Sequence, residues 1–255
     1  MAKVVVLGSG IAGHTAAALL RKWLGKNDEV TVVSPASCYN WIPSNIWVGV
    51  GLLRPGQVKF PLAPVYRRIG ITFKQAKAVA LHPEGTQADP QPTLAVEWTE
   101  NGRKGQREHV PYDFLINATG PKLNFAAAEG LGPDGASLSV CTADHAHEAS
   151  DVLLDMVARM KRGDRKRFVV GTGHGNCTCQ GAAFEYVVNL EFELRARGVR
   201  DKADVIYTSN EYELGDFGMD GVHIRRSGYI TPSKIFTESL FAERGINWVT
   251  RDTRP

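Results

Sequence analysis

The sequence lacks a long apolar run, a strong net charge and a dense set of cysteines. No segment of its 255 residues approaches the roughly 18 uninterrupted apolar residues that span a bilayer. A secretory signal is not expected, because a glycine-rich loop follows the first apolar residues at once. A net charge of +3 is too small to indicate a nucleic-acid partner. We therefore expect this chain to be soluble and to bind no nucleic acid.

Cysteine is scarce as well, and its positions argue for chemistry rather than for structure. The four cysteines are too few and too unevenly spaced for a disulfide framework: Cys38, Cys141, Cys177 and Cys179. A hydrophobic fraction of 43% and a charged fraction of 22% are typical of a globular protein. The length suits one large domain or two ordinary ones.

The first 34 residues carry the clearest motif. An apolar run at 4–7 is followed by Gly8, Gly10 and Gly13 in the G-x-G-x-x-G spacing, then by a helical pattern at 16–24 and a second apolar run at 30–33. In such a loop the first glycine allows the turn, the second lets a pyrophosphate approach, and the third lets helix and strand pack closely. The pattern predicts a dinucleotide site, although a glycine-rich turn in an ordinary α/β domain has the same spacing.

The ends of this unit predict further contacts. Backbone N–H groups at the helix start, from Ile11 and Ala12, are expected to face the pyrophosphate. An acidic residue usually follows the second strand and binds a ribose hydroxyl, but Ser34 stands there. Its hydroxyl can bond a sugar without supplying charge.

The middle of the chain returns to the first sheet. Residues 35–51 read as a polar and aromatic loop, either packed locally or covering a flat cofactor. Residues 83–106 resemble a hairpin excursion with a turn at Asn101-Gly102. The apolar run at 112–117 then leads into Ala118, Thr119 and Gly120, small residues that let backbone pass close to a cofactor. A strand that returns to the first sheet in this way resembles those of the two-dinucleotide flavoproteins, and this resemblance favours FAD over NAD in the first domain.

A second α/β unit follows with a similar pattern. After a predicted helix at 144–162, an apolar run at 168–170 enters a glycine-rich loop in which Asn176 replaces the third glycine. Predicted helices follow at 182–197 and 234–244, with strands at 204–207 and 246–250. We predict an α/β fold of two Rossmann-like, doubly wound domains, at residues 1–140 and 141–255, with the second incomplete.

The second loop carries two thiols at the start of a helix. A helix N-terminus stabilises a thiolate and so raises the reactive fraction of Cys177 and Cys179. Two alternatives stay open. Cys-x-Cys with His174 is half of a zinc site, but no second cluster completes four ligands, so no metal is predicted. Buried, inert thiols are the other.

Several segments together resemble the sulfide:quinone oxidoreductases, which are two-dinucleotide-binding disulfide-reductase flavoproteins. They are Pro43-Ser44-Asn45, Ala118 to Lys122, Cys141-Thr142-Ala143-Asp144-His145, and Cys179 to Tyr186. The resemblance implies that FAD binds the first domain, with Pro43, Asn45 and Lys122 among its contacts. It implies that sulfide attacks an oxidised cysteine pair and that sulfur accumulates as a persulfide or chain. Electrons then pass through the flavin to a quinone.

The same resemblance assigns roles to residues of the second half. Cys179 matches the family's redox cysteine, and Cys177 is an extra thiol suited to resolve it. Cys141 matches a cysteine implicated in activity and, in some members, in covalent attachment of the flavin. His145 and Glu185 match positions proposed for proton handling.

The complete protein is expected to be a homo-oligomer that touches the membrane surface through a C-terminal region beyond Pro255. Three alternatives remain open. One is the flavoprotein subunit of a cytochrome-linked sulfide dehydrogenase. The second is an NADH:quinone oxidoreductase, which Asn176 and the missing acidic residue disfavour. The third is a nucleotide-binding fragment without turnover.

Overall fold

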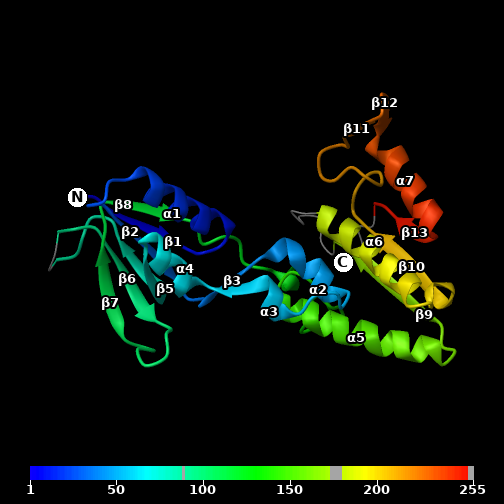
Figure 1. Ribbon diagram of the computed structural model, residues 1–255, viewed down its shortest axis with the longest axis horizontal. Helices are drawn as coiled ribbons and strands as arrows, with labels where there is room; N and C mark the ends of the chain where they lie inside the picture. Colours follow the sequence, from blue (N-terminus) through cyan, green and yellow to red (C-terminus); the bar gives the residue numbers. More distant parts are fainter. Residues whose placement is uncertain (88–89, 173–179, 252–255) are drawn as a thin grey trace. The chain divides into compact units, whose positions relative to one another are not determined.

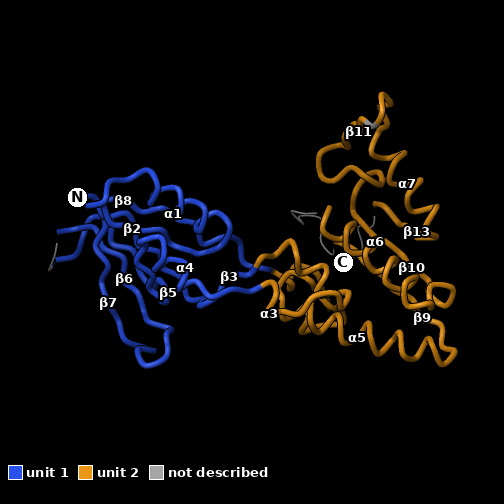
Figure 2. The backbone as a smooth tube through the Cα atoms, in the orientation of Figure 1, with its two compact units in different colours: residues 1–40, 59–123 blue, residues 41–58, 124–255 orange. Residues whose placement is uncertain are grey.

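The computed structural model describes residues 1–87, 90–172 and 180–251 of the chain. The chain forms two compact units (Figures 1 and 2). Unit 1 comprises residues 1–40 and 59–123, and unit 2 comprises residues 41–58 and 124–255. The backbone therefore passes between the units at residues 40–41, 58–59 and 123–124. The predicted domain boundary between residues 140 and 141 stays a prediction beside this division.

Unit 1 is built on a six-stranded sheet in the order β7-β6-β5-β2-β1-β8. Its parallel part contains β1 (Lys3–Leu7), β2 (Glu29–Ser34), the start of β5 (Thr72–His82) and β8 (Phe114–Asn117). β6 (Thr93–Trp98) and β7 (Arg107–Pro111) extend it in the antiparallel sense. The predicted strands and hairpin excursion are confirmed.

The central strand of unit 1 is buried on both faces, which explains its continuous apolar run. Val6 packs in the cluster formed with α1 (Ile11–Trp23) and α4 (Leu62–Ile69). Its neighbour Val5 lies in the opposite cluster with residues of β6 and β7. The predicted helix at 16–24 is therefore real but begins five residues earlier, directly after Gly10.

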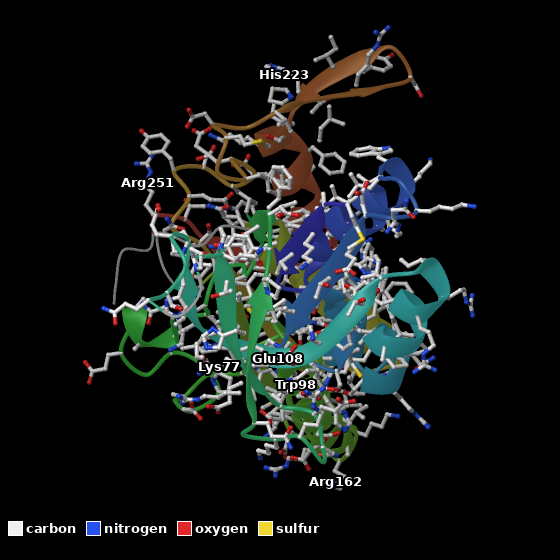
Figure 3. All side chains as sticks on the ribbon, turned by 90° about the vertical axis from the view of Figure 1, so that its left-hand side faces the viewer. Lys77, Trp98, Glu108, Arg162, His223 and Arg251 are labelled. Carbon is white, nitrogen blue, oxygen red and sulfur yellow. The ribbon has the colours of Figure 1, made fainter. Side chains whose placement is uncertain are left out.

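The antiparallel extension is fastened around Trp98. Its indole Nε1 donates to Glu108 Oε2 at 3.0 Å, and the two residues lie together on the sheet (Figure 3). Lys74 Nζ pairs with the other Glu108 oxygen at 2.7 Å. The guanidinium of Arg103 lies over the Trp98 ring, 3.4 Å from its centroid. The shared carboxylate of Glu108 and the cation–π contact at Trp98 thus hold β5, β6 and β7 together.

The prediction of a loop at residues 35–51 is wrong. β3 (Cys38–Asn40) pairs with β4 (Lys59–Pro61), and between them lie η1 (Ile42–Ser44), α2 (Asn45–Gly49) and α3 (Pro55–Val58). Four of the five residues of α2 are buried, and α2 and α3 contact α5. Helices this short are not stable alone. Packing against a longer helix, which local sequence does not reveal, therefore decides their conformation.

Unit 2 contains a parallel sheet in the order β13-β10-β9. The strands and helices of this part of the chain, in sequence order, are η2 (Phe125–Ala127), α5 (Ala143–Lys161), β9 (Lys166–Gly171), α6 (Gln180–Ala196), η3 (Arg200–Lys202), β10 (Ala203–Thr208), β11 (His223–Arg226), β12 (Tyr229–Pro232), α7 (Ser233–Arg244) and β13 (Ile246–Val249). The predicted second α/β unit is confirmed, and the antiparallel β11–β12 hairpin is an addition. No helix within the described ranges is long and apolar enough to cross a membrane.

A buried carboxylate ties three elements of unit 2 together. Glu191 of α6 is completely buried, and its oxygens meet three guanidinium groups. Arg244 of α7 lies 3.0 Å away and Arg200 of η3 lies 3.2 Å away, while Arg195 pairs with it from the next turn of α6. Arg200 also donates to the carbonyls of Ala203 and Arg244. A carboxylate so deeply buried is tolerated because every oxygen is paired.

We expect Glu191→Ala to destabilise unit 2 by about 3 kcal/mol, because it removes a buried carboxylate and leaves the partly buried guanidinium groups of Arg200 and Arg244 without their counter-charge. Urea unfolding followed by circular dichroism measures the change. Glu148→Ala, at an exposed position of α5, serves as the control and should stay within about 0.5 kcal/mol of the parent. Equal stability of the two variants would contradict a structural role for the Glu191 network.

Candidate functional site

The glycine loop of unit 1 depends on direct contact between backbone segments. Gly8 has a φ of +107°, and a Cβ there would lie 2.2 Å from the carbonyl oxygen of Ala118. A Cβ on Gly13 would lie 2.1 Å from the carbonyl oxygen of Gly8. The Gly8 N–H donates to Val33 O at 2.8 Å. A larger residue at Gly13 would therefore push α1 away from the loop, and a larger residue at Gly8 would displace the Ala118 segment.

Gly10 differs from its two neighbours in the motif because its surroundings are open. A Cβ at Gly10 would meet nothing within 4 Å. Gly10 is also the N-cap of α1, which has no side-chain cap and no acidic residue in its first turn. Ile11 and Ala12 are exposed. The first N–H groups of α1 thus lie beside open space, an arrangement that suits an anionic group such as a pyrophosphate.

Ser34 lies at the carboxyl end of β2, next to this loop. Its hydroxyl lies 2.8 Å from the hydroxyl of Ser9, and both side chains are buried. The N–H of Ala36 also donates to Ser34 Oγ at 3.4 Å. Ser9, a residue that sequence reasoning missed, therefore shares the hydroxyl that was expected to bond a ribose. The ribose contact stays a prediction.

The segment after β8 passes directly beside the glycine loop. Ala118 N donates to Leu7 O at 2.8 Å, and its own carbonyl is the atom nearest Gly8. Asn117 Oδ1 accepts from the Thr119 hydroxyl at 2.9 Å and holds the turn that follows. Gly120 has a φ of +70° with open space beside it, and Lys122 is exposed. The predicted cofactor residues of unit 1 therefore gather at the carboxyl ends of β1, β2 and β8, where ligands bind in sheets of this type.

Two further predicted cofactor residues belong to unit 2. Pro43 is exposed within η1, and Asn45 is fully buried as the first residue of α2. A buried amide of this kind fixes local backbone, and this role fits Asn45 as well as a ligand contact does. Their contact with a cofactor stays a prediction.

Cys141 and His145 lie at the start of α5, a helix of 19 residues. Cys141 is an exposed free thiol directly before the N-cap residue Thr142, whose hydroxyl accepts from the N–H of His145 at 3.1 Å. The 19-residue helix presents its positive end to this thiol. The thiol is therefore open to solvent and to small reagents at this end of the helix.

The His145 ring holds a buried nitrogen beside this thiol segment. Its Nδ1 is buried and has no hydrogen-bond partner among the residues that the structure describes. The ring meets Phe125 edge-on, with centroids 6.0 Å apart. Buried polar atoms are normally paired, and the exceptions concentrate at functional sites. His145 is therefore suited to take or give a proton.

The remaining predicted catalytic residues adjoin α6. Glu185 is exposed in its second turn. Cys177 and Cys179 lie outside the described residues, directly before the start of α6 at Gln180. Among the described residues, no group of three His, Cys, Asp and Glu side chains is placed to hold a metal ion.

Glu211, which sequence reasoning passed over, follows the carboxyl end of β10. Its carboxylate is buried and accepts from the Phe217 N–H at 2.6 Å and from the Ser209 hydroxyl at 2.9 Å. Phe217 has a φ of +51°, which is strained for a bulky residue. Glu211 thus stabilises its own loop, and its carboxylate is not available to a ribose.

Comparison with known proteins places these features in context. The model of the pyridine nucleotide-disulphide oxidoreductases matches residues 2–197. The sulfide-quinone reductase of Aquifex aeolicus is 33% identical over 250 residues, which is 98% of this chain and 51% of that protein. The crystal structure of the sulfide:quinone oxidoreductase from this bacterium superposes with a TM-score of 0.78 at 30% identity, over 98% of this chain and 51% of that one.

A more distant structure shares the fold alone. NDH2 from Plasmodium falciparum in complex with NADH gives a TM-score of 0.65 at 17% identity, over 98% of this chain and 48% of that one. This chain thus spans about half the length of the relatives that it matches.

The different surroundings of Gly10 and Gly13 predict separable effects of alanine. Gly13→Ala should lower the stability of the chain by roughly 1 to 3 kcal/mol, because its Cβ collides with backbone. Gly10→Ala should leave stability unchanged but weaken flavin binding by about tenfold or more, because its Cβ would enter the open space beside the first N–H groups of α1, where a pyrophosphate is predicted. Thermal unfolding and quenching of FAD fluorescence measure the two effects. Unchanged FAD affinity in Gly10→Ala would contradict the predicted site.

His14, in the first turns of α1, predicts a pH effect. Burial lowers the pKa of His14 below its usual 6.5, and its Nδ1 lies 3.2 Å from the Tyr66 hydroxyl. As pH falls below about 6.5, the unfolded chain binds this proton before the folded chain does, so stability decreases. We expect the thermal unfolding midpoint to fall less between pH 7 and pH 5 in His14→Gln than in the parent. The exposed control, His223→Gln, should show the same fall as the parent; equal curves for both variants would refute the assignment.

Proposed function

The chain belongs to the pyridine nucleotide-disulphide oxidoreductases, and we propose that it binds FAD in unit 1 and serves the oxidation of sulfide with a quinone as the electron acceptor. Sequence identity of 33% to a sulfide-quinone reductase over 98% of the chain supports this function. The observation that carries it is the start of α5, where the exposed thiol of Cys141 precedes the helix and the buried Nδ1 of His145, in its first turn, has no hydrogen-bond partner among the described residues.

The residues of unit 1 fit a flavin dinucleotide. The open side of Gly10 and the uncapped start of α1 suit the pyrophosphate, and the Ala118–Gly120 turn lies beside them. When bound, the flavin supplies a two-electron acceptor that a quinone reoxidises. The protein's part is to hold this group and to exclude competing acceptors.

The sulfur chemistry is proposed for the cysteines of unit 2. Sulfide attacks a disulfide that contains Cys179; that bond breaks, a persulfide bond forms on Cys179, and the partner cysteine leaves as a thiolate. Cys177 is suited by its spacing to be that partner. The sulfide sulfur loses two electrons in all, and the quinone gains them with two protons. Sulfide supplies one proton and solvent supplies the other.

Proton transfer is the proposed task of His145 and Glu185. An imidazole has two ring nitrogens, one able to accept a proton while the other donates one, which suits a group that passes a solvent proton inward. Glu185 is exposed and therefore in contact with that solvent. Homo-oligomerisation and contact with a membrane surface are proposed for the complete protein alone.

One observation weighs against NADH as the electron donor. Dinucleotide sites of this kind use an acidic residue after the second strand to bind ribose. In unit 2 that strand is β10, and the carboxylate of Glu211 is buried within its own loop. Reduction by sulfide is therefore favoured over reduction by a nicotinamide nucleotide.

We expect anaerobic addition of sulfide to bleach the oxidised-flavin absorbance of the FAD-loaded protein, and NADH to leave it unchanged. A quinone analogue should restore the absorbance. Bleaching by NADH alone would refute the proposal and would make the second loop a nicotinamide site.

Cysteine variants locate the chemistry in the same assay. Cys179→Ser should retain FAD but lose reduction by sulfide by about 100-fold or more, because the attacked sulfur is gone. Cys38→Ser is the matched control, since Cys38 is an exposed free thiol of unit 1 outside the proposed site, and it should react like the parent. Undiminished turnover of Cys179→Ser would overturn its role.

A further inference from the structure

One side of α6 faces the short helix α2 within unit 2. Tyr186, Leu190 and Glu193 share this side, and Arg197 directly follows the last residue of the helix, Ala196. The Tyr186 hydroxyl donates to Gly49 O at 3.2 Å, and the Arg197 guanidinium donates to Val50 O at 3.4 Å. Both acceptors are carbonyls at the C-terminal end of α2, which lack partners within the helix. Side chains of α6 thus hold the end of α2.

Gly49 allows α2 to pack closely against Tyr186 and Val140. A Cβ on Gly49 would lie 2.9 Å from Cε2 of Tyr186 and 2.8 Å from Cγ1 of Val140. Gly49 is helical, so no special φ requires glycine there. Its α carbon therefore lies between the Tyr186 ring and the residue that precedes Cys141. Three segments meet at one point, and only the missing side chain permits it.

The hydrogen bond from Tyr186 persists over the whole working range of pH. Burial raises the pKa of Tyr186 to about 12, so the phenol stays protonated and remains a donor. The hydrogen bond from Tyr186 to Gly49 O is therefore not lost by deprotonation of the phenol.

We propose that Tyr186 is a positioning residue, which with Gly49 fixes the start of α6 relative to the Cys141 segment. The inference rests on the proposed sulfide oxidation and extends it, because Tyr186 lies one residue after Glu185 and Val140 one residue before Cys141. Tyr186 acts through the backbone that it holds. The consequence is that the Cys141 segment keeps a fixed position relative to α6 during turnover.

The test uses the FAD-loaded protein and four variants with matched controls. Gly49→Ala introduces the collision, Tyr186→Ala removes the ring, Tyr186→Phe keeps the ring without the hydroxyl, and the fourth combines Gly49→Ala with Tyr186→Ala. Gly56→Ala is the control for Gly49, because it lies in the same 41–58 segment with nothing within 4 Å of its Cβ. Leu190→Val is the control for stability, since Leu190 is buried on the same side of α6.

Stopped-flow reduction by sulfide is the first readout. Gly49→Ala and Tyr186→Ala should lower the maximal rate constant by about 10- to 100-fold, with the half-saturating sulfide concentration unchanged. Tyr186→Phe should stay within about threefold, because its ring still packs on Gly49. Gly49→Ala should cost less in the Tyr186→Ala background, since part of the collision is gone. Leu190→Val should lower the unfolding midpoint without changing the rate.

Alkylation of Cys141 by iodoacetamide is a second readout that needs no turnover. It is measured in a chain where the other three cysteines are serine. Gly49→Ala should change this rate by about threefold or more, and Gly56→Ala should not, because only the former displaces Val140.

The outcomes separate the two proposals. If sulfide fails to reduce the parent protein, the proposed function fails, while Cys141 alkylation still decides the role of Gly49 and Tyr186. If Gly49→Ala does not fold, the contrast between Tyr186→Ala and Tyr186→Phe decides it. Variants that lower only the unfolding midpoint, with both rates within about twofold of the parent, would overturn the positioning role.

Discussion

Contact of backbone with backbone at Gly8 and Gly13 is the constraint on which unit 1 depends. The carbonyl of Ala118 occupies the place of a Gly8 side chain, and the carbonyl of Gly8 occupies that of Gly13. These contacts set the distance of α1 from β1 and β8, and so decide where the first N–H groups of the helix lie. Gly10 is free of such contacts. The same loop therefore uses two glycines for folding and leaves one for a ligand.

In unit 2, buried carboxylates hold neighbouring elements together, as close backbone contacts at glycines do in unit 1. Glu191 gathers three guanidinium groups at the ends of α6 and α7, and Glu211 holds the loop after β10 in a strained conformation. Both carboxylates bond to groups of unit 2, and burying a carboxylate costs free energy unless its oxygens are paired. The two carboxylates therefore stabilise unit 2 itself.

The sequence predicted the regular elements well because their apolar periodicity is long and local. It failed for residues 35–51, where five-residue α2 exists only through packing on α5. The β11–β12 hairpin has a local signal in the sequence, which is the pair Ser227-Gly228. These two residues have φ values of +50° and +87°, as a two-residue hairpin turn requires. Ser9 and Tyr186 had no such signal. Their roles arise from partners 25 and 137 positions away, and no local pattern contains that information.

The packing around α2 matters for the proposed function because it lies next to the segment that contains Cys141. A helix start makes a cysteine reactive, but a reaction between sulfur centres also needs them held within bonding reach. Short elements such as α2 tolerate displacement, because few hydrogen bonds of their own resist it. Anchoring the carbonyls of Gly49 and Val50 to Tyr186 and Arg197 transfers the rigidity of 17-residue α6 to this weak element. Cys141 follows Val140, which packs against the same glycine, so the rigidity reaches the thiol segment through a single close contact.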